Sequence, residues 1–503
     1  MLQIGTSRRR PLQVIKTIGD TMKQKRIFAI ALALVAVTLM CAPFISFAQV
    51  RTGEGEATLL QEGEYDIAVG ESIHLGATRG TAETVAEQIH QKLLQYSTRI
   101  DISTLRCSVN DIDAYYSNVI NDNPDLFFVS SSYQYYYTQY GNYVTAIVPQ
   151  YAMTQNEVAA AMEIFDAGAA KALKEVNDSM NDLQKALTIH DYICAYAIYP
   201  NIYDEDGYYV AENDLDIYHS AYGFFKDETA VCAGYTLTFS YLMHQLGIDC
   251  EYVSSDDMEH AWNKVKINGN WYNIDITYDN SDYVDAENTY GLAYHNCFLK
   301  SDIYFQSESG LYHYSFSDYD AGEATDTTYD NYFWDDVNSR IYSVNGDFYY
   351  LDPNYESYLC YLKKRTLSGS ESNLNGTAFR SATISSTRYA FDSSGTQHNI
   401  PHTDILIRLL YLDGKFFVTD SSKLYCIKMN GTKSTLLSGI GYTISLGSVD
   451  GNIVYQTYDD MSTIVTVDKK EYFRNYLNGN HFYPDVNNDG IVNGRDWANI
   501  INN

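Results

Sequence analysis

A cysteine, a histidine and an aspartate follow one another in this chain, each in a sequence context that favours chemistry. Cys232 lies at the start of a run with helical spacing of apolar residues, which ends at Gly247. Unpaired backbone N–H groups in the first turn of a helix favour an anion, so a thiol there is expected to ionise readily. His260 and Asp275 lie on either side of Asn268-Gly269, a dipeptide typical of a type I′ hairpin turn. The three residue types are those of a nucleophile, a base and a carboxylate that orients the base.

The hairpin predicts how the histidine and the aspartate meet. Counting outward from a two-residue turn pairs Trp262 with Asp275 and His260 with Thr277. His260 and Asp275 are then diagonal neighbours on one face of the ladder, within reach of each other. The spacing therefore predicts contact between base and carboxylate, whereas the packing of the cysteine against that face does not follow from it.

Two residues beside Cys232 shape the predicted start of the helix. Thr229 is expected to act as the N-cap, which places Cys232 in the first turn. Gly234 lies further along that turn, where glycine costs roughly 1 kcal/mol relative to alanine. Its presence predicts that a substrate or a neighbouring strand approaches the helix closely there.

The sequence around these residues resembles the transglutaminase-like superfamily, a papain-related fold that uses a catalytic cysteine. The resemblance rests on three ordered blocks, VCAGY (231–235), HAWN (260–263) and WYNIDITYD (271–279). It extends over residues 75–320 through four further segments, at 121–129, 189–199, 219–225 and 295–302. The form that it resembles is the one seen in secreted bacterial proteins.

The resemblance implies a role for each of the three residues. Cys232 would be the nucleophile, His260 the general base and acid, and Asp275 the residue that orients the imidazole. It implies no cofactor for catalysis. The backbone N–H of Cys232 is one expected oxyanion donor, and Tyr196 or His219 is a candidate for the second.

The elements around the three blocks predict an α+β domain in which helices pack on a small antiparallel sheet. Apolar periodicity predicts helices over 81–94, 109–120, 154–176 and 182–199, and an aromatic run predicts one or two strands over 127–148. His190 and Asp191 are adjacent on a predicted helix, where neighbours point apart. A structural role is therefore expected for His190. The six cysteines other than Cys232 and Cys41 are expected to be buried thiols rather than disulfides.

The start of the chain predicts secretion. Residues 22–48 combine basic Lys23 and Arg26 with an apolar run and a small-residue cleavage sequence that ends at Ala48, which is typical of a signal peptide. A retained membrane anchor is the alternative. The formal net charge is −30, and becomes about −36 without the basic leader. Such acidity disfavours nucleic acid and anionic membranes as partners, and the mature protein is expected to retain no membrane segment.

Residues 325–470 have the composition of an all-β domain. Short Tyr, Val and Ile runs alternate with Asn-Gly, Asp-Gly and Ser-Gly turns, and the segment 345–364 is echoed by 413–431. Repeated hairpins predict either an open set of propeller-like sheets or a sandwich. The many tyrosines are expected to pack across strands.

The last segment, 484–503, predicts a short EF-hand-like calcium site. Gly490 lies at loop position 6, and oxygen ligands occupy positions 1, 3, 5, 7, 9 and 12, which are Asp485, Asn487, Asp489, the Ile491 carbonyl, Asn493 and Asp496. The loop resembles a dockerin repeat, which implies a cohesin-bearing scaffold of the cellulosome type as partner. Dockerins usually carry two such repeats, and this sequence shows one.

Together these features predict a secreted transglutaminase-like cysteine enzyme that acts on peptide or amide bonds through a thioester. Its substrate is expected to be a protein or peptide, for example a cell-wall peptide. Water as acceptor gives a peptidase or amidase and a lysine amine gives a cross-linking transglutaminase; hydrolysis is preferred because water is always present. The alternatives are a non-catalytic binding or adhesion protein, and a glycosidase, for which no carboxylate pair stands in a recognisable setting.

Overall fold

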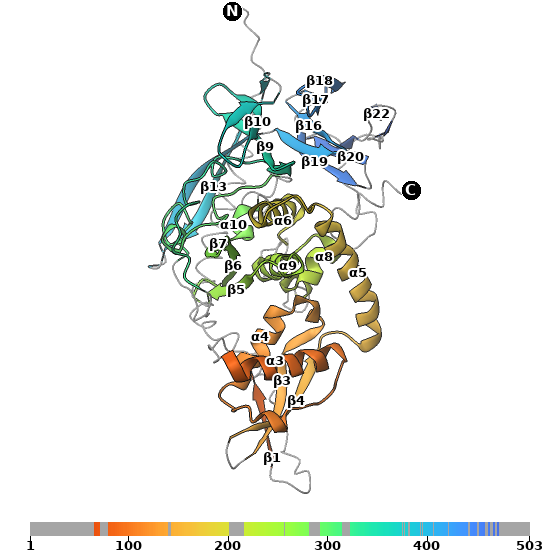
Figure 1. The fold of residues 1–503 in the computed structure, drawn as a ribbon, viewed down its shortest axis with the longest axis vertical. Helices are drawn as coiled ribbons and strands as arrows, with labels where there is room; N and C mark the ends of the chain where they lie inside the picture. The colour runs from red at the N-terminus through yellow and green to blue at the C-terminus, as the bar shows by residue number, and fades with distance from the viewer. Residues whose placement is uncertain are drawn as a thin grey trace, which may run out of the picture.

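The computed structural model describes residues 65–70, 79–138, 142–200, 216–255, 257–280, 292–313, 322–374 and most of 376–471. Three parts follow one another along the long axis of the molecule: an N-terminal sheet with two helices, a helical centre with a three-stranded sheet, and a set of β-sheets (Figure 1). The predicted signal peptide (22–48) and the predicted calcium loop (484–503) lie outside the described residues. No helix in the described part is long and apolar enough to cross a membrane.

The N-terminal part is an antiparallel sheet covered by helices. Its strands pair in the order β1-β3-β4-β2, and the predicted aromatic run forms two of them. Val85, Ile89 and Leu93 form one apolar face of α3 and are fully buried, as their spacing predicts. The elements are β1 (Tyr65–Gly70), α3 (Arg79–Leu94), β2 (Ile100–Asp101), η1 (Ser103–Leu105), α4 (Ile112–Asp122), η2 (Pro124–Leu126), β3 (Val129–Thr138) and β4 (Val144–Tyr151).

The central part begins with two helices whose starts are set by capping boxes. Thr154 and Glu157 cap α5 (Gln155–Leu173), and Asn181 and Gln184 cap α6 (Asp182–Tyr196). The helices η3 (Asp216–His219), α8 (Ala221–Asp227) and α9 (Cys232–Gln245) follow. Helix α9 packs on α6 and α8 and against a three-stranded sheet (Figure 1).

That sheet has the order β5-β6-β7 and consists of β5 (Cys250–Ser255), β6 (His260–Ile267) and β7 (Asn270–Ile274). Two one-turn helices follow it, α10 (Ile276–Asp279) and α12 (Asp302–Phe305). The α+β architecture predicted for this region, with helices packed on a small antiparallel sheet, is confirmed. One hydrophobic core joins these helices and strands to Trp334, which lies in a turn before β8, and to Phe348 and Tyr350 of β9 in the first sheet of the β region.

The β region is antiparallel, as predicted. Its first sheet has the order β11-β10-β9-β8 with β12 beside β10, a second has the order β15-β16-β17-β18, and a third has the order β19-β20-β21. The echoed segments 345–364 and 413–431 become the hairpins β9-β10 and β16-β17 of the first two sheets. The strands are β8 (Tyr342–Val344), β9 (Asp347–Asn354), β10 (Leu359–Arg365), β11 (Glu371–Asn373), β12 (Phe379–Arg380), β13 (Thr383–Phe391), β14 (Gln397–Ile405), β15 (Arg408–Leu412), β16 (Lys415–Thr419), β17 (Lys423–Lys428), β18 (Lys433–Ser438), β19 (Thr443–Val449), β20 (Asn452–Thr457), β21 (Met461–Ser462), β22 (Thr466–Val467) and β23 (Lys470–Glu471).

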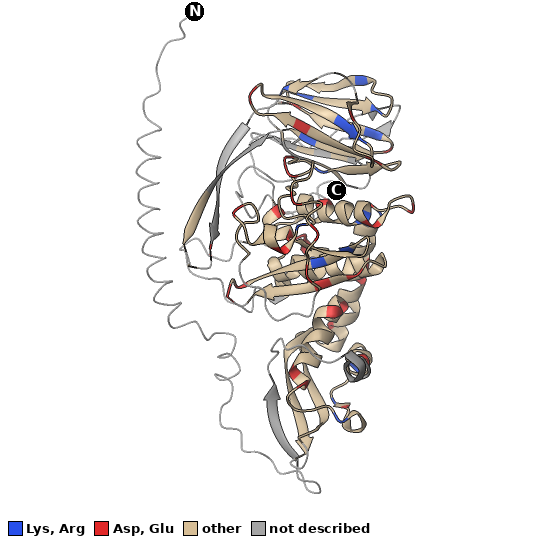
Figure 2. Cartoon of the chain, turned by 60° about the vertical axis from the view of Figure 1, so that its left-hand side comes forward, with Lys and Arg blue, Asp and Glu red and all other residues tan. Residues whose placement is uncertain are grey.

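Alternation along the strands explains how these sheets stack. On β16, Phe416 and Val418 pack with Leu351 and Leu362 of the first sheet, whereas Phe417 between them packs toward the third sheet. The second sheet is therefore buried on both faces. Lys and Arg residues occur on several of these strands, while Asp and Glu residues occur in all three parts (Figure 2). The predicted alternatives for this region, an open set of propeller-like sheets or a sandwich, stay predictions.

Candidate functional site

Cys232 is the first residue of helix α9. The residue before it, Val231, is the N-cap and has an extended backbone, so the prediction that Thr229 caps this helix is wrong. Thr229 pairs with Ile198 in a short parallel bridge, and the N–H of Ala230 donates to the carbonyl of Ile198. This pairing keeps the chain extended up to Val231. Cys232 therefore stands at the first helical position, whose backbone N–H has no partner within an α-helix.

The thiol of Cys232 is more accessible than the other described thiols. All seven described cysteines are free, and Cys232 is half-buried whereas the other six are buried. The expectation of buried thiols rather than disulfides is therefore confirmed for those six. A reagent or substrate that approaches the folded protein will meet Cys232 first.

The segment before α8 lies against the first turn of α9 at Gly234 and leaves no room for a side chain there. A Cβ atom at Gly234 would overlap the carbonyl oxygen of Tyr218 and lie 3.0 Å from that of Ser220. The N–H of Val231 donates to the same Tyr218 carbonyl at 3.0 Å. The close approach predicted at Gly234 is confirmed, and the approaching group is the backbone of residues 218–220.

The hairpin between β6 and β7 has the predicted turn. Ile267 pairs with Asn270, and Asn268 and Gly269 have φ angles of 52° and 89°, the left-handed values that a type I′ turn needs at both positions. His260 is the first residue of β6. The turn thus fixes the register between β6 and β7, and with it the position of His260 at the start of β6.

Asp275 lies beyond the ladder rather than on it. The pairing ends at Asn263 with Ile274, so the predicted pairs of Trp262 with Asp275 and His260 with Thr277 do not form. Asp275 instead caps helix α10: its Oδ1 accepts hydrogen bonds from the N–H groups of Thr277 at 2.8 Å and Tyr278 at 3.2 Å. The local preference of aspartate for a helix N-cap ends the strand.

The contact between the histidine and the aspartate is nevertheless made. Nε2 of His260 lies 2.7 Å from Oδ2 of Asp275, whose side chain is fully buried. This leaves Nδ1 of His260 for a second partner, and the thiol of Cys232 is a hydrogen-bond partner of this side chain. The structure thus brings Cys232, His260 and Asp275 into one connected group.

A fourth residue of this group, His313, was not found from the sequence. It follows α12, and its Nε2 lies 2.8 Å from Oδ2 of Asp275 while its Nδ1 lies 2.7 Å from the carbonyl oxygen of Gly310. The ring stacks on Phe305 at 4.2 Å between centroids and meets the edge of Trp262 at 5.0 Å. A single histidine in a loop carries no spacing pattern, so only the folded chain reveals it.

The charges of the group depend on one another. Burial lowers the pKa of His260, but the carboxylate of Asp275, its hydrogen bond and the contact with Cys232 outweigh this and raise the pKa to about 10. Burial raises the pKa of Asp275, but the two imidazoles lower it below the ordinary value. His260 is therefore a cation and Asp275 an anion at neutral pH.

The two residues considered as second oxyanion donors have different surroundings. His219 is exposed and ends the 3-10 turn η3, whose neighbouring carbonyl at Tyr218 contacts the start of α9. The ring of Tyr196 lies near the side chains of Lys171 and Arg340, at 5.6 and 5.8 Å. The second oxyanion donor stays a prediction.

His190 and Asp191 contact each other, contrary to the prediction that they point apart. Nδ1 of His190 lies 2.9 Å from Oδ1 of Asp191. Both side chains are buried, and they join His295 in a second group. Two groups in the described residues, this one and His260–Asp275–His313, have the ligand types of a metal site.

Comparison with known proteins identifies one domain of the chain. Residues 170–276 match the sequence profile of the Transglutaminase-like superfamily, and Cys232, His260 and Asp275 lie within this range. No curated protein matches the chain. A solved structure described as "Crystal structure of a TGase" is similar, with 15% sequence identity and a TM-score of 0.20. That likeness covers 27% of this chain and 41% of the other, so this chain spans less than half of that protein's length.

Proposed function

We propose that this chain, in which residues 170–276 form a transglutaminase-like domain, is a cysteine-dependent enzyme that cleaves peptide or amide bonds through a thioester. The observation that supports the proposal is the linked group of three side chains. Cys232 is half-buried at a helix start, His260 contacts it, and buried Asp275 holds the other nitrogen of His260. Nucleophile, base and orienting carboxylate are the parts that this chemistry needs.

The reaction starts from a thiolate and an imidazolium. The sulfur of Cys232 attacks the substrate carbonyl carbon, and the backbone N–H at the start of α9 donates to the oxygen that becomes negative. The imidazolium of His260 gives its proton to the leaving amine as the C–N bond breaks, which yields a thioester. Water then adds to the thioester while His260 takes its proton, and the C–S bond breaks to release the acid and restore the thiolate.

Asp275 acts through His260. Its carboxylate accepts a hydrogen bond from Nε2, which leaves Nδ1 as the nitrogen whose proton moves during the reaction, and Cys232 is the other hydrogen-bond partner of the ring. The same carboxylate stabilises the charged ring between the two steps. Asp275 does not need to gain a proton, in agreement with its lowered pKa.

The experiment that tests this function compares the full-length protein with Cys232→Ala. Cell-wall peptides and glutamine-containing proteins are incubated with each and followed by mass spectrometry. Release of fragments by the wild type alone supports hydrolysis, and new cross-links by the wild type alone would assign transamidation instead. Equal products, or none, from both proteins would contradict an enzymatic role and favour the binding or adhesion protein.

We also propose, on sequence alone, that the protein is secreted and that its tail binds calcium. Residues 22–48 have the pattern of a signal peptide, and the loop from Asp485 to Asp496 has calcium-loop spacing. The resemblance of this loop to dockerin repeats suggests a cohesin-bearing partner. Calcium should change the circular dichroism of a peptide covering 480–503; an unchanged spectrum during titration would contradict the calcium site.

A further inference from the structure

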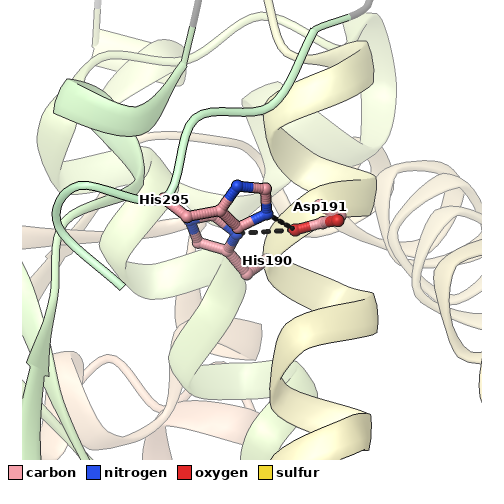
Figure 3. A group of neighbouring side chains, drawn as sticks. All are labelled: His190, Asp191 and His295. Carbon is pink, nitrogen blue, oxygen red and sulfur yellow. Dashed lines mark hydrogen bonds and ion pairs between the residues drawn. The ribbon is translucent and has the colours of Figure 1, made fainter. Parts of the chain in front are cut away.

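A second group of two histidines around one aspartate lies buried beside the candidate catalytic group. His190 and Asp191 belong to α6, and His295 comes from the segment after α10 (Figure 3). Nδ1 of His190 and Nε2 of His295 both lie 2.9 Å from the same oxygen, Oδ1 of Asp191. All three side chains are buried. The group repeats the arrangement of His260 and His313 on Asp275.

The outer nitrogens of the two rings determine their protonation. Nε2 of His190 lies 3.2 Å from Oδ2 of Asp279, and Nδ1 of His295 lies 2.8 Å from the carbonyl oxygen of Val337. Nε2 of His190 also lies 3.6 Å from the thiol of Cys194, farther than from Asp279. Carbonyl and carboxylate oxygens accept hydrogen bonds, so with Asp191 and Asp279 ionised each ring donates from both of its nitrogens. A ring with two N–H groups is an imidazolium. A neutral ring would turn a lone pair toward one of these oxygens.

The charges in the group then cancel. Two imidazolium rings balance the carboxylates of Asp191 and Asp279, so a buried group of four ionisable side chains carries no net charge. Burial alone would lower the pKa of His190, but its contacts with Cys194, Asp191 and Asp279 raise it well above the ordinary value. The direction of that shift agrees with the count of hydrogen-bond donors.

A divalent metal ion would neutralise the same two carboxylates, so the fit of a metal has to be examined. His190, Asp191 and His295 offer three ligand atoms, and a structural zinc site is closed by four ligands. Every ring nitrogen of the two histidines already has an oxygen at hydrogen-bond distance. Protons therefore fit the described side chains better than a metal ion does.

The group is connected to Asp275 through helix α10. Asp279, the partner of His190, is the last residue of this one-turn helix, and Asp275 is its N-cap. Cys297 holds both ends: its N–H donates to the carboxylate of Asp279 at 3.0 Å, and its carbonyl accepts from the N–H of Asp275 at 3.0 Å. The side chain of Asn280 ties the end of α10 to the last turn of α6.

The group also binds the chain that leads into the β region. The N–H of Ile341 donates to Oδ2 of Asp191, and Val337 receives the hydrogen bond of His295. Strand β8 begins at Tyr342, directly after these contacts. One buried group thus contacts α6, α10 and the start of the first β-sheet.

We propose that His190 and His295 are metal-free imidazolium ions that act as positioning residues, holding α10 and with it Asp275 in the geometry that orients His260. The contact of His190 with Asp279 fixes the C-terminal end of α10. The contacts of His295 with Asp191 and Val337 fix its position between α6 and the segment that leads into β8. The expected effect on turnover rests on the proposed function. The protonation of His190 and His295 and the absence of a metal from their site are independent of that function.

The first test reads the protonation and metal content of the full-length protein without any substrate. Histidine-selective ¹⁵N NMR at pH 8 should show the rings of His190 and His295 with both nitrogens protonated, assigned by their loss in His190→Asn and His295→Gln. Elemental mass spectrometry should find well under one zinc or other transition-metal ion per chain, with calcium counted separately because of the proposed loop at 485–496. One zinc per chain that disappears in both variants, or two neutral rings, would overturn the proposal.

The second test reads the position of Asp275. His295→Gln keeps a donor where Nε2 stood and removes the charge and the bond to Val337. The alkylation rate of Cys232 by iodoacetamide at pH 6.5 should fall about tenfold, and kcat on any substrate found should fall by a similar factor with KM little changed, because small displacements of catalytic groups are costly. Exposed His244→Gln should match the wild type in both measurements.

The outcomes of the two tests are distinct. A lower melting temperature with an unchanged alkylation rate and an unchanged pH profile would show that the group only stabilises the fold, and would overturn the positioning role. If the wild type turns over no substrate, the proposed function fails, while the NMR, metal and alkylation measurements still decide the state and role of His190 and His295.

Discussion

Replacing Asp275 with asparagine should uncouple the imidazole of His260 from the thiol of Cys232. In the wild type, Oδ2 of Asp275 accepts hydrogen bonds from both His260 and His313. Asparagine has nearly the same size and its oxygen can still cap α10, but it lacks the negative charge that raises the pKa of His260. Removing one partner of a buried ion pair costs roughly 3–5 kcal/mol. We therefore expect a folded, less stable protein with an altered thiol.

The expected change in reactivity follows from the charge of His260. Its pKa of about 10, against an ordinary value of 6.5, corresponds to about 5 kcal/mol in favour of the charged ring. A charged imidazolium beside a sulfur favours the thiolate, which is the form that reacts with iodoacetamide, and a neutral ring does not. A more basic thiolate is also more nucleophilic, which offsets part of the loss. Alkylation of Cys232 at pH 6.5 should therefore slow by about 10- to 100-fold in Asp275→Asn.

The assay is the rate of iodoacetamide alkylation between pH 5 and pH 9, with Cys232 quantified by peptide mass spectrometry. The Asp275→Asn rate should be lower than the wild-type rate at pH 6.5, and the two rates should approach each other toward pH 9. Asp249→Asn is the matched control, since this exposed carboxylate pairs with Lys266 on the same sheet. If Asp275→Asn keeps a native circular dichroism spectrum and the wild-type pH profile, Asp275 does not control the charge of His260.

Four further outcomes are expected. Iodoacetamide should label Cys232 before any other cysteine of the native protein, because the other described thiols are buried; earlier labelling of another site, read by peptide mapping, contradicts this. His313→Gln should keep one donor to Asp275 and lower the alkylation rate less than His313→Leu does; equal rates would remove His313 from the site. Gly234→Ala should lower the free energy of unfolding by about 1–3 kcal/mol, because its Cβ would overlap the Tyr218 carbonyl; an unchanged urea midpoint argues against that contact. The raised pKa of His260 stabilises the fold fully below pH 6.5, and this stabilisation is lost as pH rises toward 10. Between pH 6.5 and pH 9.5, the free energy of unfolding measured in urea should therefore fall by about 4 kcal/mol more in the wild type than in His260→Gln. An equal fall in both proteins would contradict the raised pKa of His260.

The two buried groups share one design. In each, two imidazoles donate to a single oxygen of an aspartate, and the outer nitrogen of one ring donates to a backbone carbonyl, that of Gly310 for His313 and that of Val337 for His295. They differ at the remaining ring. His260 has the half-buried thiol of Cys232 as a hydrogen-bond partner, whereas the outer nitrogen of His190 lies 3.2 Å from the carboxylate of Asp279 and 3.6 Å from the buried thiol of Cys194. The exposure of the thiol therefore separates the candidate catalytic group from the group that supports it.

Several features of the site could be predicted because they depend on neighbours in the sequence. Asn268-Gly269 forms a tight turn with two left-handed residues, so the register of β6 and β7 follows from two residues. The apolar spacing after Cys232 predicts α9, and Gly247 with a φ of 73° lies just past its end. Turn and helix preferences of this kind arise from contacts between residues close in the sequence, so they can be predicted from the sequence alone.

The sequence by itself determined which residue types follow one another, and so the helix that begins near Cys232 and the hairpin that carries His260 toward Asp275. The tertiary structure decided where Asp275 stands, because a cap for α10 competes with the last pair of the ladder. It also decided that His313 reaches Asp275 and that His295 reaches Asp191, contacts between residues far apart in the chain. Such contacts depend on how whole elements pack, and no local spacing records that packing.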